Sequence, residues 1–257
     1  MTYDYTWFKK AVYDLTKIDL TAYKEKQMKR RIDTLINKNA IVGYDKYIVE
    51  LRNSKDKFDE FVNYLTINVS EFYRNPGQWD ILDREVFPYT INKYGKNLKI
   101  WSAACSTGDE PYSLVMALSK HLPLNQIRIH ATDIDKQVIA KAKVGLYSEK
   151  SIAAVPAEFK KKYFTPLGPS FQISDEIKRQ VDFKEHNLLK DAYPPACHLI
   201  VCRNVLIYFT EEAKVDIYKK FYHALLPGGN LFIGSTEQII NHTEIGYTRH
   251  GSFFYRK

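Results

Sequence analysis

Apolar residues recur at helical spacing through the first quarter of the chain. Four such stretches cover residues 7–15, 28–36, 44–51 and 58–65. Apolar side chains three and four positions apart share one face of a helix, so each stretch predicts an amphipathic helix. Gly43 and the Asn53-Ser54 pair supply breaks between them. We therefore predict a helical N-terminal domain over residues 1–66.

From residue 79 the pattern changes to helices alternating with short apolar runs, which is typical of a parallel α/β sheet. The predicted helices cover residues 79–94, a stretch opening at Pro111, a stretch opening near Lys136, and 210–226. The predicted strands cover 98–101, 127–132, 181–183, 198–202 and 231–234, with a closing antiparallel pair in the tail. Gly and Pro residues interrupt the alternation over about 145–180, where 171–173 is the only clear strand-like piece. This interruption predicts a short inserted β subdomain.

Between the two regions, residues 67–78 form a segment that fits neither pattern. It carries Asn68, Ser70 and Arg74 with two large aromatic residues among them. A plain linker would carry fewer aromatic and hydrogen-bonding groups. The segment is either a packed connector or the lining of a site, and we predict the second, because pockets often form between domains. The remainder, 79–257, is the predicted α/β domain.

Composition and charge narrow the class of protein. The 257 residues are 45% hydrophobic and 26% charged, as in soluble globular proteins. The sequence has no run near the roughly 20 apolar residues of a membrane span and no signal-peptide core at its start, so a cytoplasmic protein is expected. Its three cysteines lack metal-like spacing, and no partner His or Cys stands at ligand spacing from His186, so no metal site is expected.

The net charge of +8 favours an acidic partner, whether nucleic acid, an anionic membrane or an acidic protein surface. Basic residues gather on the second predicted helix, relieved only by Glu25. They are Lys24, Lys26, Lys29, Arg30 and Arg31. They form either a solvated helix face or a surface that docks an acidic partner.

The stretch LKIWSAACSTGDEPY, residues 98–112, has the layout of a nucleoside cradle: a strand, a loop of small residues and a helix start. Its single Gly108 does not make the GxGxxG pattern of dinucleotide binding. Asp133 lies 25 residues after Gly108, at the tip of the second predicted strand, where a carboxylate can accept hydrogen bonds from ribose hydroxyls. The alternative is that Asp133 caps the next helix, although Asp135 is the better N-cap candidate.

Polar residues at the carboxyl ends of successive predicted strands complete the candidate site. Together with Asn68, Ser70 and Arg74 they are Gly108, Glu110, Asp133, Asn187 with Leu188, and Arg203 with Asn204. The sequence shows no Ser-His-Asp order, no paired catalytic carboxylates and no GxxxxGK phosphate loop. A nucleoside ligand without phosphates therefore fits best, and S-adenosylmethionine is the common cofactor of that kind.

The chain resembles the chemotaxis receptor methyltransferases of the CheR family. The motifs that carry the resemblance are TINVSEFYRNP (66–76), WSAACSTGDEPYSLVM (101–116), ATDID (131–135), VDFKEHNLL (181–189), CRNVLIYF (202–209) and LLPGGNLFIGSTE (225–237). The resemblance implies a Rossmann-like S-adenosylmethionine-dependent methyltransferase domain behind a small all-α domain. It also implies methyl transfer to receptor glutamates, giving glutamyl methyl esters and S-adenosylhomocysteine.

The resemblance also implies roles for single residues. Asn68, Ser70 and Arg74 would close over the cofactor, with Arg74 near the transferring methyl and the substrate carboxylate. Glu110 would contact the methionine end or the sugar, and Asp133 the ribose. Asn187 and Leu188 would flank the adenine, Arg203 and Asn204 would line the pocket floor, and Tyr208 would face the reacting centre; for Tyr208, simple packing at a strand end is the alternative.

The family often has Thr where Ser70 stands and Glu where Asp109 stands, and both changes keep the hydroxyl or the charge. Some members grip a receptor-tail peptide with the inserted subdomain, but this insertion is short and rich in Pro and Lys, and we do not extend that role to it. The implied partners are glutamate-rich cytoplasmic helices of chemoreceptors, with no nucleic acid and no membrane insertion, and a monomer is expected.

Two other functions stay open at this point. The high pI suggests a methyltransferase acting on RNA or DNA, although CRNVLIYF stands where a base-methylating Asn/Asp-Pro-Pro-Tyr/Phe motif would be and no aromatic RNA-binding signature is present. A non-catalytic nucleoside-binding regulatory domain is the second alternative.

Overall fold

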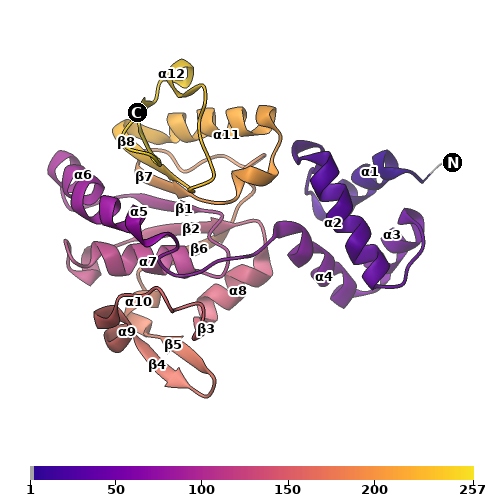
Figure 1. Ribbon diagram of the computed structural model, residues 1–257, viewed down its shortest axis with the longest axis horizontal. Helices are drawn as coiled ribbons and strands as arrows, with labels where there is room; N and C mark the ends of the chain where they lie inside the picture. The colour runs from indigo at the N-terminus through magenta and orange to yellow at the C-terminus, as the bar shows by residue number, and fades with distance from the viewer. Residues whose placement is uncertain (1–2) are drawn as a thin grey trace. The chain divides into compact units, whose positions relative to one another are not determined.

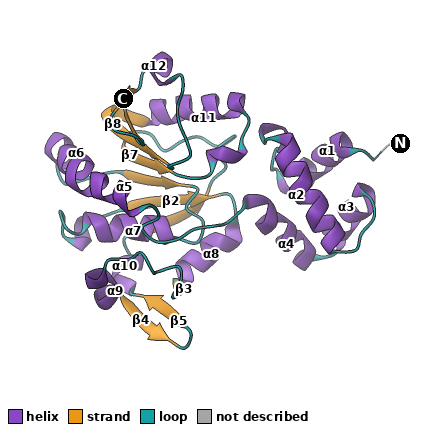
Figure 2. Cartoon of the chain, viewed as in Figure 1, coloured by secondary structure: helices purple, strands orange, loops and turns teal. Residues whose placement is uncertain are grey.

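The chain divides into two compact units in the computed structural model, which describes residues 3–257 (Figures 1 and 2). One unit holds the residues up to Asn68 together with Ile207–Asp216. The other holds Val69–Leu206 and Ile217–Lys257. Within residues 3–257 no helix combines the length and the apolar character needed to cross a membrane.

The N-terminal unit contains the four predicted helices. They are α1 (Tyr5–Thr16), α2 (Glu25–Lys38), α3 (Tyr44–Asn53) and α4 (Lys55–Thr66), with a 3₁₀ turn, η1 (Leu20–Ala22), between the first two. The rings of Phe8, Tyr47 and Phe61 lie 5.8–6.5 Å apart and form its core. The Asp4 carboxylate caps α1 by accepting a hydrogen bond from the backbone N–H of Trp7.

Residues 207–216 belong to this N-terminal unit, although the sequence boundaries place them in the α/β domain. They hold the end of η4 (Leu206–Tyr208) and the start of α11 (Glu211–Ala224). The Phe209 ring stacks on Tyr23 with centroids 4.6 Å apart. The backbone N–H of Thr210 donates to the carbonyl of Ala22 at 2.8 Å. The segment therefore packs against η1 and the residues that follow it.

The second unit is built on a seven-stranded sheet of order β6-β2-β1-β7-β8-β10-β9. The strands are β6 (Val181–Glu185), β2 (Ile129–Asp133), β1 (Ile100–Ala103), β7 (Cys197–Cys202), β8 (Leu225–Ile233), β10 (Phe254–Arg256) and β9 (Thr248–Arg249). The first five run parallel to one another. Strand β10 pairs antiparallel with β8, and β9 pairs antiparallel with β10. The strand order reverses at β1, so the crevice beside its carboxyl end is where an open α/β sheet binds its ligand. The Rossmann-like fold class is confirmed.

Helices cover both faces of this sheet, which explains why β1 is buried at all four positions. They are α5 (Pro76–Ile81), the π turn η2 (Leu82–Val86), α6 (Phe87–Tyr94), α7 (Asp109–Leu118), α8 (Lys136–Val144), α11 and α12 (His242–Ile245), with the 3₁₀ turn η3 (Leu124–Gln126). Ile100 packs in the cluster that contains Leu114 of α7. Trp101, its neighbour on β1, contacts Phe221 of α11 with ring centroids 5.5 Å apart.

The predicted insertion is a three-stranded antiparallel sheet of order β3-β5-β4, visible below the large sheet in Figures 1 and 2. Its elements are β3 (Leu146–Ser148), α9 (Ala157–Tyr163), β4 (Phe164–Leu167), β5 (Ser170–Ile173) and α10 (Asp175–Lys178). Only β5 was predicted as a strand. The strand β3 is too short to show alternation. Pro166 lacks an N–H donor, which normally argues against a strand. It is tolerated in β4 because β4 lies at the edge of its sheet.

Strand β8 begins at Leu225, six positions before the predicted start at residue 231. Pro227, Gly228 and Gly229 predicted a break, but the strand continues through them with a local irregularity: Gly228 has a φ of 89°, and the register with β7 shifts between Cys197 and Leu199. The backbone N–H of Gly228 donates to the carbonyl of Lys257, and the N–H of Lys257 donates to the carbonyl of Gly229. A Cβ on Gly229 would lie 3.0 Å from the Cys197 carbonyl oxygen, so a residue without a side chain fits against β7. Tertiary pairing here overrides the local signal.

Candidate cofactor-binding site

The loop after β1 is held in a tight conformation by residues with positive φ. Ala104 has a φ of 62°, Ser106 of 48° and Gly108 of 90°. A Cβ on Gly108 would lie 2.9 Å from the Ala142 side chain and 3.1 Å from the Tyr147 hydroxyl oxygen, so only glycine fits this position. The loop turns directly into α7, which begins at Asp109, two residues before the predicted start.

Asp133 ends β2 and is 6% exposed. Its Oδ2 accepts a hydrogen bond from the backbone N–H of Ser106 at 2.8 Å, and its Oδ1 accepts one from Asp135 at 3.0 Å. Burial raises the pKa of Asp133 to about 6, and the N–H donors oppose that rise. Asp135 is the N-cap of α8, where it accepts from the N–H of Gln137 at 2.8 Å, so the prediction that Asp135 is the better cap is confirmed.

Glu110 lies in the first turn of α7. Its Oε1 accepts a hydrogen bond from the Ser102 hydroxyl at 2.8 Å, and its Oε2 lies 3.7 Å from Nη1 of Arg203. Burial raises the pKa of Glu110, while Arg203 and Ser102 lower it. The carboxylate thus faces both the carboxyl edge of β1 and the residue that follows β7.

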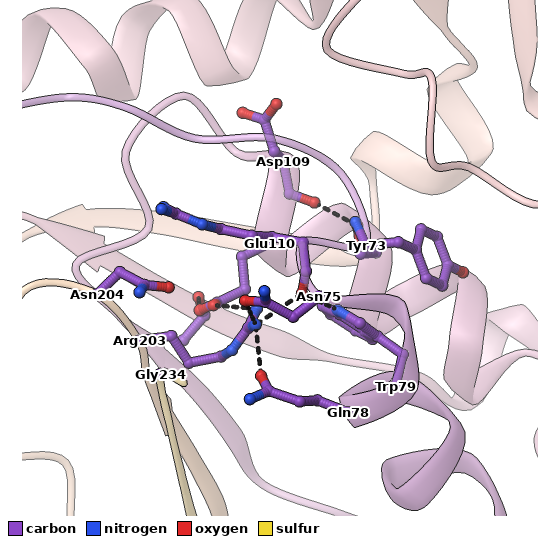
Figure 3. Close-up of polar contacts among 12 residues, drawn as sticks. Tyr73, Asn75, Gln78, Trp79, Asp109, Glu110, Arg203, Asn204 and Gly234 are labelled. Atoms are coloured by element: carbon purple, nitrogen blue, oxygen red, sulfur yellow. Dashed lines mark hydrogen bonds and ion pairs between the residues drawn. The ribbon is translucent and has the colours of Figure 1, made fainter. Parts of the chain in front are cut away.

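Arg203 is the central polar residue of the site, with a side chain only 2% exposed (Figure 3). Its Nη2 donates hydrogen bonds to the carbonyl of Arg74 at 2.6 Å, to Oε1 of Gln78 at 2.7 Å and to Oδ1 of Asn75 at 3.2 Å. The guanidinium carbon also lies 4.7 Å from the centroid of the Phe232 ring. Arg203 therefore ties the segment after Val69 to the end of β7.

That segment is packed and does not behave as a flexible linker. Ser70 hydrogen-bonds the Asp109 carboxylate, and the N–H of Tyr73 donates to the Ser113 hydroxyl at 3.1 Å. The Thr107 hydroxyl also donates to Asp109, which is 1% exposed. Asp109 and Ser113 were not among the predicted site residues. The sequence pattern indicates only that Asp109 lies near the start of a helix and that Ser113 lies within it.

Arg74, in the same segment, has a side chain that is only partly buried. Its side chain is 34% exposed, with Nε 4.0 Å from Glu71 and Nη1 donating to the carbonyl of Val69 at 3.5 Å. These contacts are long, so they hold the guanidinium weakly. Its backbone, by contrast, is fixed by the hydrogen bonds from Arg203 and from the indole N–H of Trp79.

Asn187 and Leu188 follow β6 in a tight turn. Oδ1 of Asn187 accepts a hydrogen bond from the N–H of Leu189 at 2.9 Å, and its own N–H donates to Asp191 at 2.7 Å. Leu188 is 8% exposed. In the described part of the chain no three His, Cys, Asp or Glu side chains gather in a way that could hold a metal ion.

Asn204 follows Arg203 with a φ of 61°. Its N–H donates to Oε2 of Glu237 at 2.9 Å, while its own Oδ1 is buried without a hydrogen-bond partner. Glu237 is 7% exposed and also accepts from Leu206 and Gly234. Glu237 was not among the predicted site residues, because a glutamate shortly after a strand is normally exposed.

Two predicted residues, Asn68 and Tyr208, belong to the N-terminal unit. Asn68 donates through Nδ2 to the Thr66 hydroxyl at 2.8 Å and to Oδ1 of Asn63 at 3.0 Å. The carbonyl of Tyr208 accepts a hydrogen bond from the N–H of Lys24 at 2.9 Å. The other predicted site residues all belong to the second unit, whereas Asn68 and Tyr208 belong to the first. Those in the second unit are Ser70, Arg74, Gly108, Glu110, Asp133, Asn187, Leu188, Arg203 and Asn204.

The basic cluster divides into two sets. Lys24, which immediately precedes α2, and Lys26 and Arg30 on α2 are exposed. Lys29 pairs with Asp33 one turn along at 2.8 Å. Arg31 donates to the carbonyl of Tyr64 at 2.7 Å and lies over its ring. The first three residues face solvent, whereas Lys29 and Arg31 contact their own unit.

The candidate site residues contain buried polar atoms that a polar cofactor can pair. Ser106 Oγ, Asn204 Oδ1, Gln78 Nε2 and Arg203 Nε are buried without a hydrogen-bond partner. Buried polar atoms are nearly always paired in folded proteins, so unpaired atoms of both donor and acceptor type indicate that a polar ligand completes them. Hydroxyl, amino and carboxylate groups such as those of S-adenosylmethionine can supply such partners.

Comparison with known proteins identifies the family of the chain. Residues 68–252 match the family model "CheR methyltransferase, SAM binding domain", and residues 3–66 match "CheR methyltransferase, all-alpha domain". The chain is 39% identical to a chemotaxis protein methyltransferase of Listeria innocua over 99% of its length and 97% of the relative's. It is 31% identical to one of Borreliella burgdorferi, over 93% of this chain and 89% of that one. The chain therefore belongs to the CheR family of S-adenosylmethionine-dependent methyltransferases.

Proposed function

We propose that this methyltransferase esterifies glutamate side chains in the cytoplasmic helices of chemoreceptors, forming glutamyl methyl esters and S-adenosylhomocysteine. The observation that carries the proposal is the near full-length similarity to chemotaxis protein methyltransferases. The chemistry agrees with it: a glutamate with a pKa of about 4.3 is already ionised at neutral pH, so it needs no general base to act as a nucleophile.

The proposed cofactor contacts are those that the resemblance to the family implies. Asp133 accepts from the ribose hydroxyls, and Asn187 with Leu188 flanks the adenine. Glu110 faces the methionine end or the sugar. Asn68, Ser70, Arg74, Gly108, Arg203 and Asn204 complete the lining. When bound, S-adenosylmethionine supplies a methyl group on a positively charged sulfur, which is an activated leaving group.

The contribution of the protein is then positioning and exclusion of water. Arg74 is proposed to orient the substrate carboxylate. The partial exposure of the side chain and its long contacts support this role, because the guanidinium can turn toward an arriving anion. A strong ion pair would also stabilise the ground-state carboxylate, so Arg74 orients more than it activates. Tyr208 is proposed to face the reacting centre.

Receptor docking is proposed for the basic cluster at α2, where the exposed Lys24, Lys26 and Arg30 dominate and Lys29 and Arg31 contribute at its margin. A positive helix face attracts a glutamate-rich helix and speeds its encounter. We further propose that the enzyme works as a monomer in the cytoplasm. The proposed division is a helical domain over 1–66, a connector over 67–78 and the methyltransferase domain over 79–257.

The test is a transfer assay with S-adenosylmethionine labelled in its methyl group, given a receptor cytoplasmic fragment in one reaction and an RNA pool in another. We expect label on the receptor fragment that is released by mild alkali, as an ester requires, and none on RNA. Alkali-stable label on RNA would establish the nucleic-acid alternative instead. Cofactor binding without transfer to any receptor fragment would favour the regulatory alternative.

A further inference from the structure

Glu237 is a buried carboxylate that holds three backbone N–H groups at once. Its Oε2 accepts from Asn204 at 2.9 Å and from Gly234 at 2.7 Å, and its Oε1 accepts from Leu206 at 2.8 Å. Within residues 3–257 it is one of a small group of buried charged side chains, at 7% exposure. Hydrogen bonds to a charged group contribute more than neutral ones, so this carboxylate fixes the turn at residues 203–206 to the end of β8.

The turn needs such an anchor because its backbone is strained. Asn204 has a φ of 61°, a region that non-glycine residues rarely adopt and that surrounding contacts must impose. Space around it is also minimal: a Cβ on Gly234 would lie 2.7 Å from the Asn204 nitrogen and 2.7 Å from Oε2 of Glu237. Gly234 therefore lets β8 approach the turn closely enough for one carboxylate to reach all three donors.

The turn carries two side chains that face the proposed cofactor site. Arg203 grips the carbonyl of Arg74, and the Asn204 side chain extends toward the group around Glu110 and Arg203, with its Oδ1 buried and unpaired (Figure 3). A shift of the turn would move both side chains. The three backbone donors take most of the acceptor capacity of Glu237, so it acts through the turn and does not need to touch the ligand.

We propose that Glu237 is a positioning residue for cofactor binding: its carboxylate clamps the 203–206 turn so that Asn204 presents its side-chain amide to S-adenosylmethionine. This inference rests on the proposed role of Asn204 in the cofactor site. It does not depend on which substrate receives the methyl group.

The substitution Glu237→Gln tests the clamp with almost no change in size. A glutamine has one acceptor oxygen, so its NH₂ group must face at least one of the three backbone N–H donors, whichever way the amide turns. At least one donor is left unpaired, and the turn relaxes. The expected effect on affinity for S-adenosylhomocysteine is a loss of about tenfold or more, from one unpaired buried donor.

The decisive experiment is a double-mutant cycle on S-adenosylhomocysteine binding by calorimetry. Asn204→Gly removes the side chain while keeping a residue that tolerates the positive φ. If Glu237 acts through Asn204, Glu237→Gln in the Asn204→Gly background should weaken binding by less than about threefold, because the contact it positions is already gone. Thr90→Val, a buried change in α6 that removes only a hydroxyl bonded to the Val86 carbonyl, is the control and should leave binding unchanged.

A second variant covers the case in which Glu237→Gln does not fold. Gly234→Ala keeps the carboxylate but pushes a methyl group between it and the turn, so it should also weaken binding and also lose its effect beside Asn204→Gly. Wild-type affinity in both clamp variants, or penalties that add fully to that of Asn204→Gly, would overturn the proposal. Absence of receptor esterification would overturn the proposed function and leave this cycle intact, so the two failures are distinguishable.

Discussion

Asp133 shows how one residue at a strand end can serve both the fold and the ligand. Its two oxygens receive the N–H groups of Ser106 and Asp135, which shape the β1 loop and the approach to α8. The N–H of Ile134 also contributes, and an ionised carboxylate has about four lone-pair sites, so acceptor capacity remains for a ribose hydroxyl. Burial raises the pKa of Asp133 to about 6, so the group titrates close to physiological pH.

This raised pKa predicts that affinity for S-adenosylhomocysteine falls as the pH drops through about 6. Protonation removes acceptor capacity, so the affinity is highest above that pH. Calorimetric titration between about pH 5 and 8 measures the effect. Asp133→Asn should bind weakly and with a flatter pH profile. A wild-type affinity that is constant across this range would contradict the assignment of Asp133 to the ribose.

The same group also affects stability, with the opposite sign. A carboxyl whose pKa is raised in the folded state binds its proton more tightly there than in the unfolded chain. Its contribution to the free energy of unfolding is therefore fully present below the ordinary pKa of aspartate and is lost as the pH rises through about 6.

Arg74 gives the second prediction at the residue scale. Arg74→Ala should lower kcat by about 100-fold while changing the Kd of S-adenosylhomocysteine by less than about threefold, because the side chain is proposed to orient the substrate more than to hold the cofactor. Turnover on a receptor fragment and calorimetry provide the two numbers. Arg84→Ala, an exposed arginine in η2, is the matched control. Unchanged turnover in Arg74→Ala would exclude a role at the reacting centre.

At the scale of elements, the segment around Phe72 joins the inserted subdomain to the cofactor loop. The Phe72 ring meets Tyr147 edge-on at 4.7 Å and Phe164 at 5.3 Å, and its N–H donates to the carbonyl of Ser151. The Tyr147 hydroxyl in turn donates to the carbonyl of Thr107 at 2.7 Å. The insertion therefore supports both segments that are proposed to hold the cofactor.

Phe72→Ala should lower the free energy of unfolding by about 3–5 kcal/mol, as expected for a fully buried phenylalanine that leaves a cavity. Denaturant titration measures the loss. Val69→Ala, three positions earlier and 73% exposed, should change stability by less than about 0.5 kcal/mol and is the control. A cost below about 1 kcal/mol in Phe72→Ala would mean that the aromatic cluster does not anchor the segment.

The sequence predicted the elements of the site better than its contacts. Strands β1, β2 and β7 were located within a few residues because buried parallel strands carry runs of apolar residues. Strand β6 was also located, although it lies at the sheet edge and only its Phe183 is buried. Asp109 and Glu237 were missed, since their burial depends on partners at Ser70 and at residues 204–206, which periodicity does not reveal. Strand β8 was predicted too short for the same reason. Gly228 and Gly229 pair with Lys257, which is too far along the chain for a local sequence pattern to reveal.

At the scale of the whole molecule, charge is the property that would matter most for reaching the substrate. The net charge is +8, and three exposed cations gather at the start of α2. Attraction between exposed charges is screened over about 8 Å at physiological ionic strength, so it acts chiefly on the rate of encounter.

The double variant Lys26→Gln with Arg30→Gln should lower the association rate with a receptor fragment by about tenfold at low salt and flatten its salt dependence. Stopped-flow or surface-binding kinetics at several salt concentrations give the result. Lys46→Gln with Arg52→Gln removes two exposed charges from α3 and serves as the control. Equal rates and equal salt slopes in both double variants would exclude docking through α2.

The stacking of Phe209 on Tyr23 has a consequence for how this enzyme can be recombined with its relatives. The N-terminal unit is completed by residues 207–216, which lie about 140 positions further along the chain than Asn68. A chimaera that exchanges only the first 66 residues would pair a foreign η1 with the native Phe209 and Thr210. Exchanging both stretches together keeps the partners matched and so preserves the Tyr23–Phe209 contact.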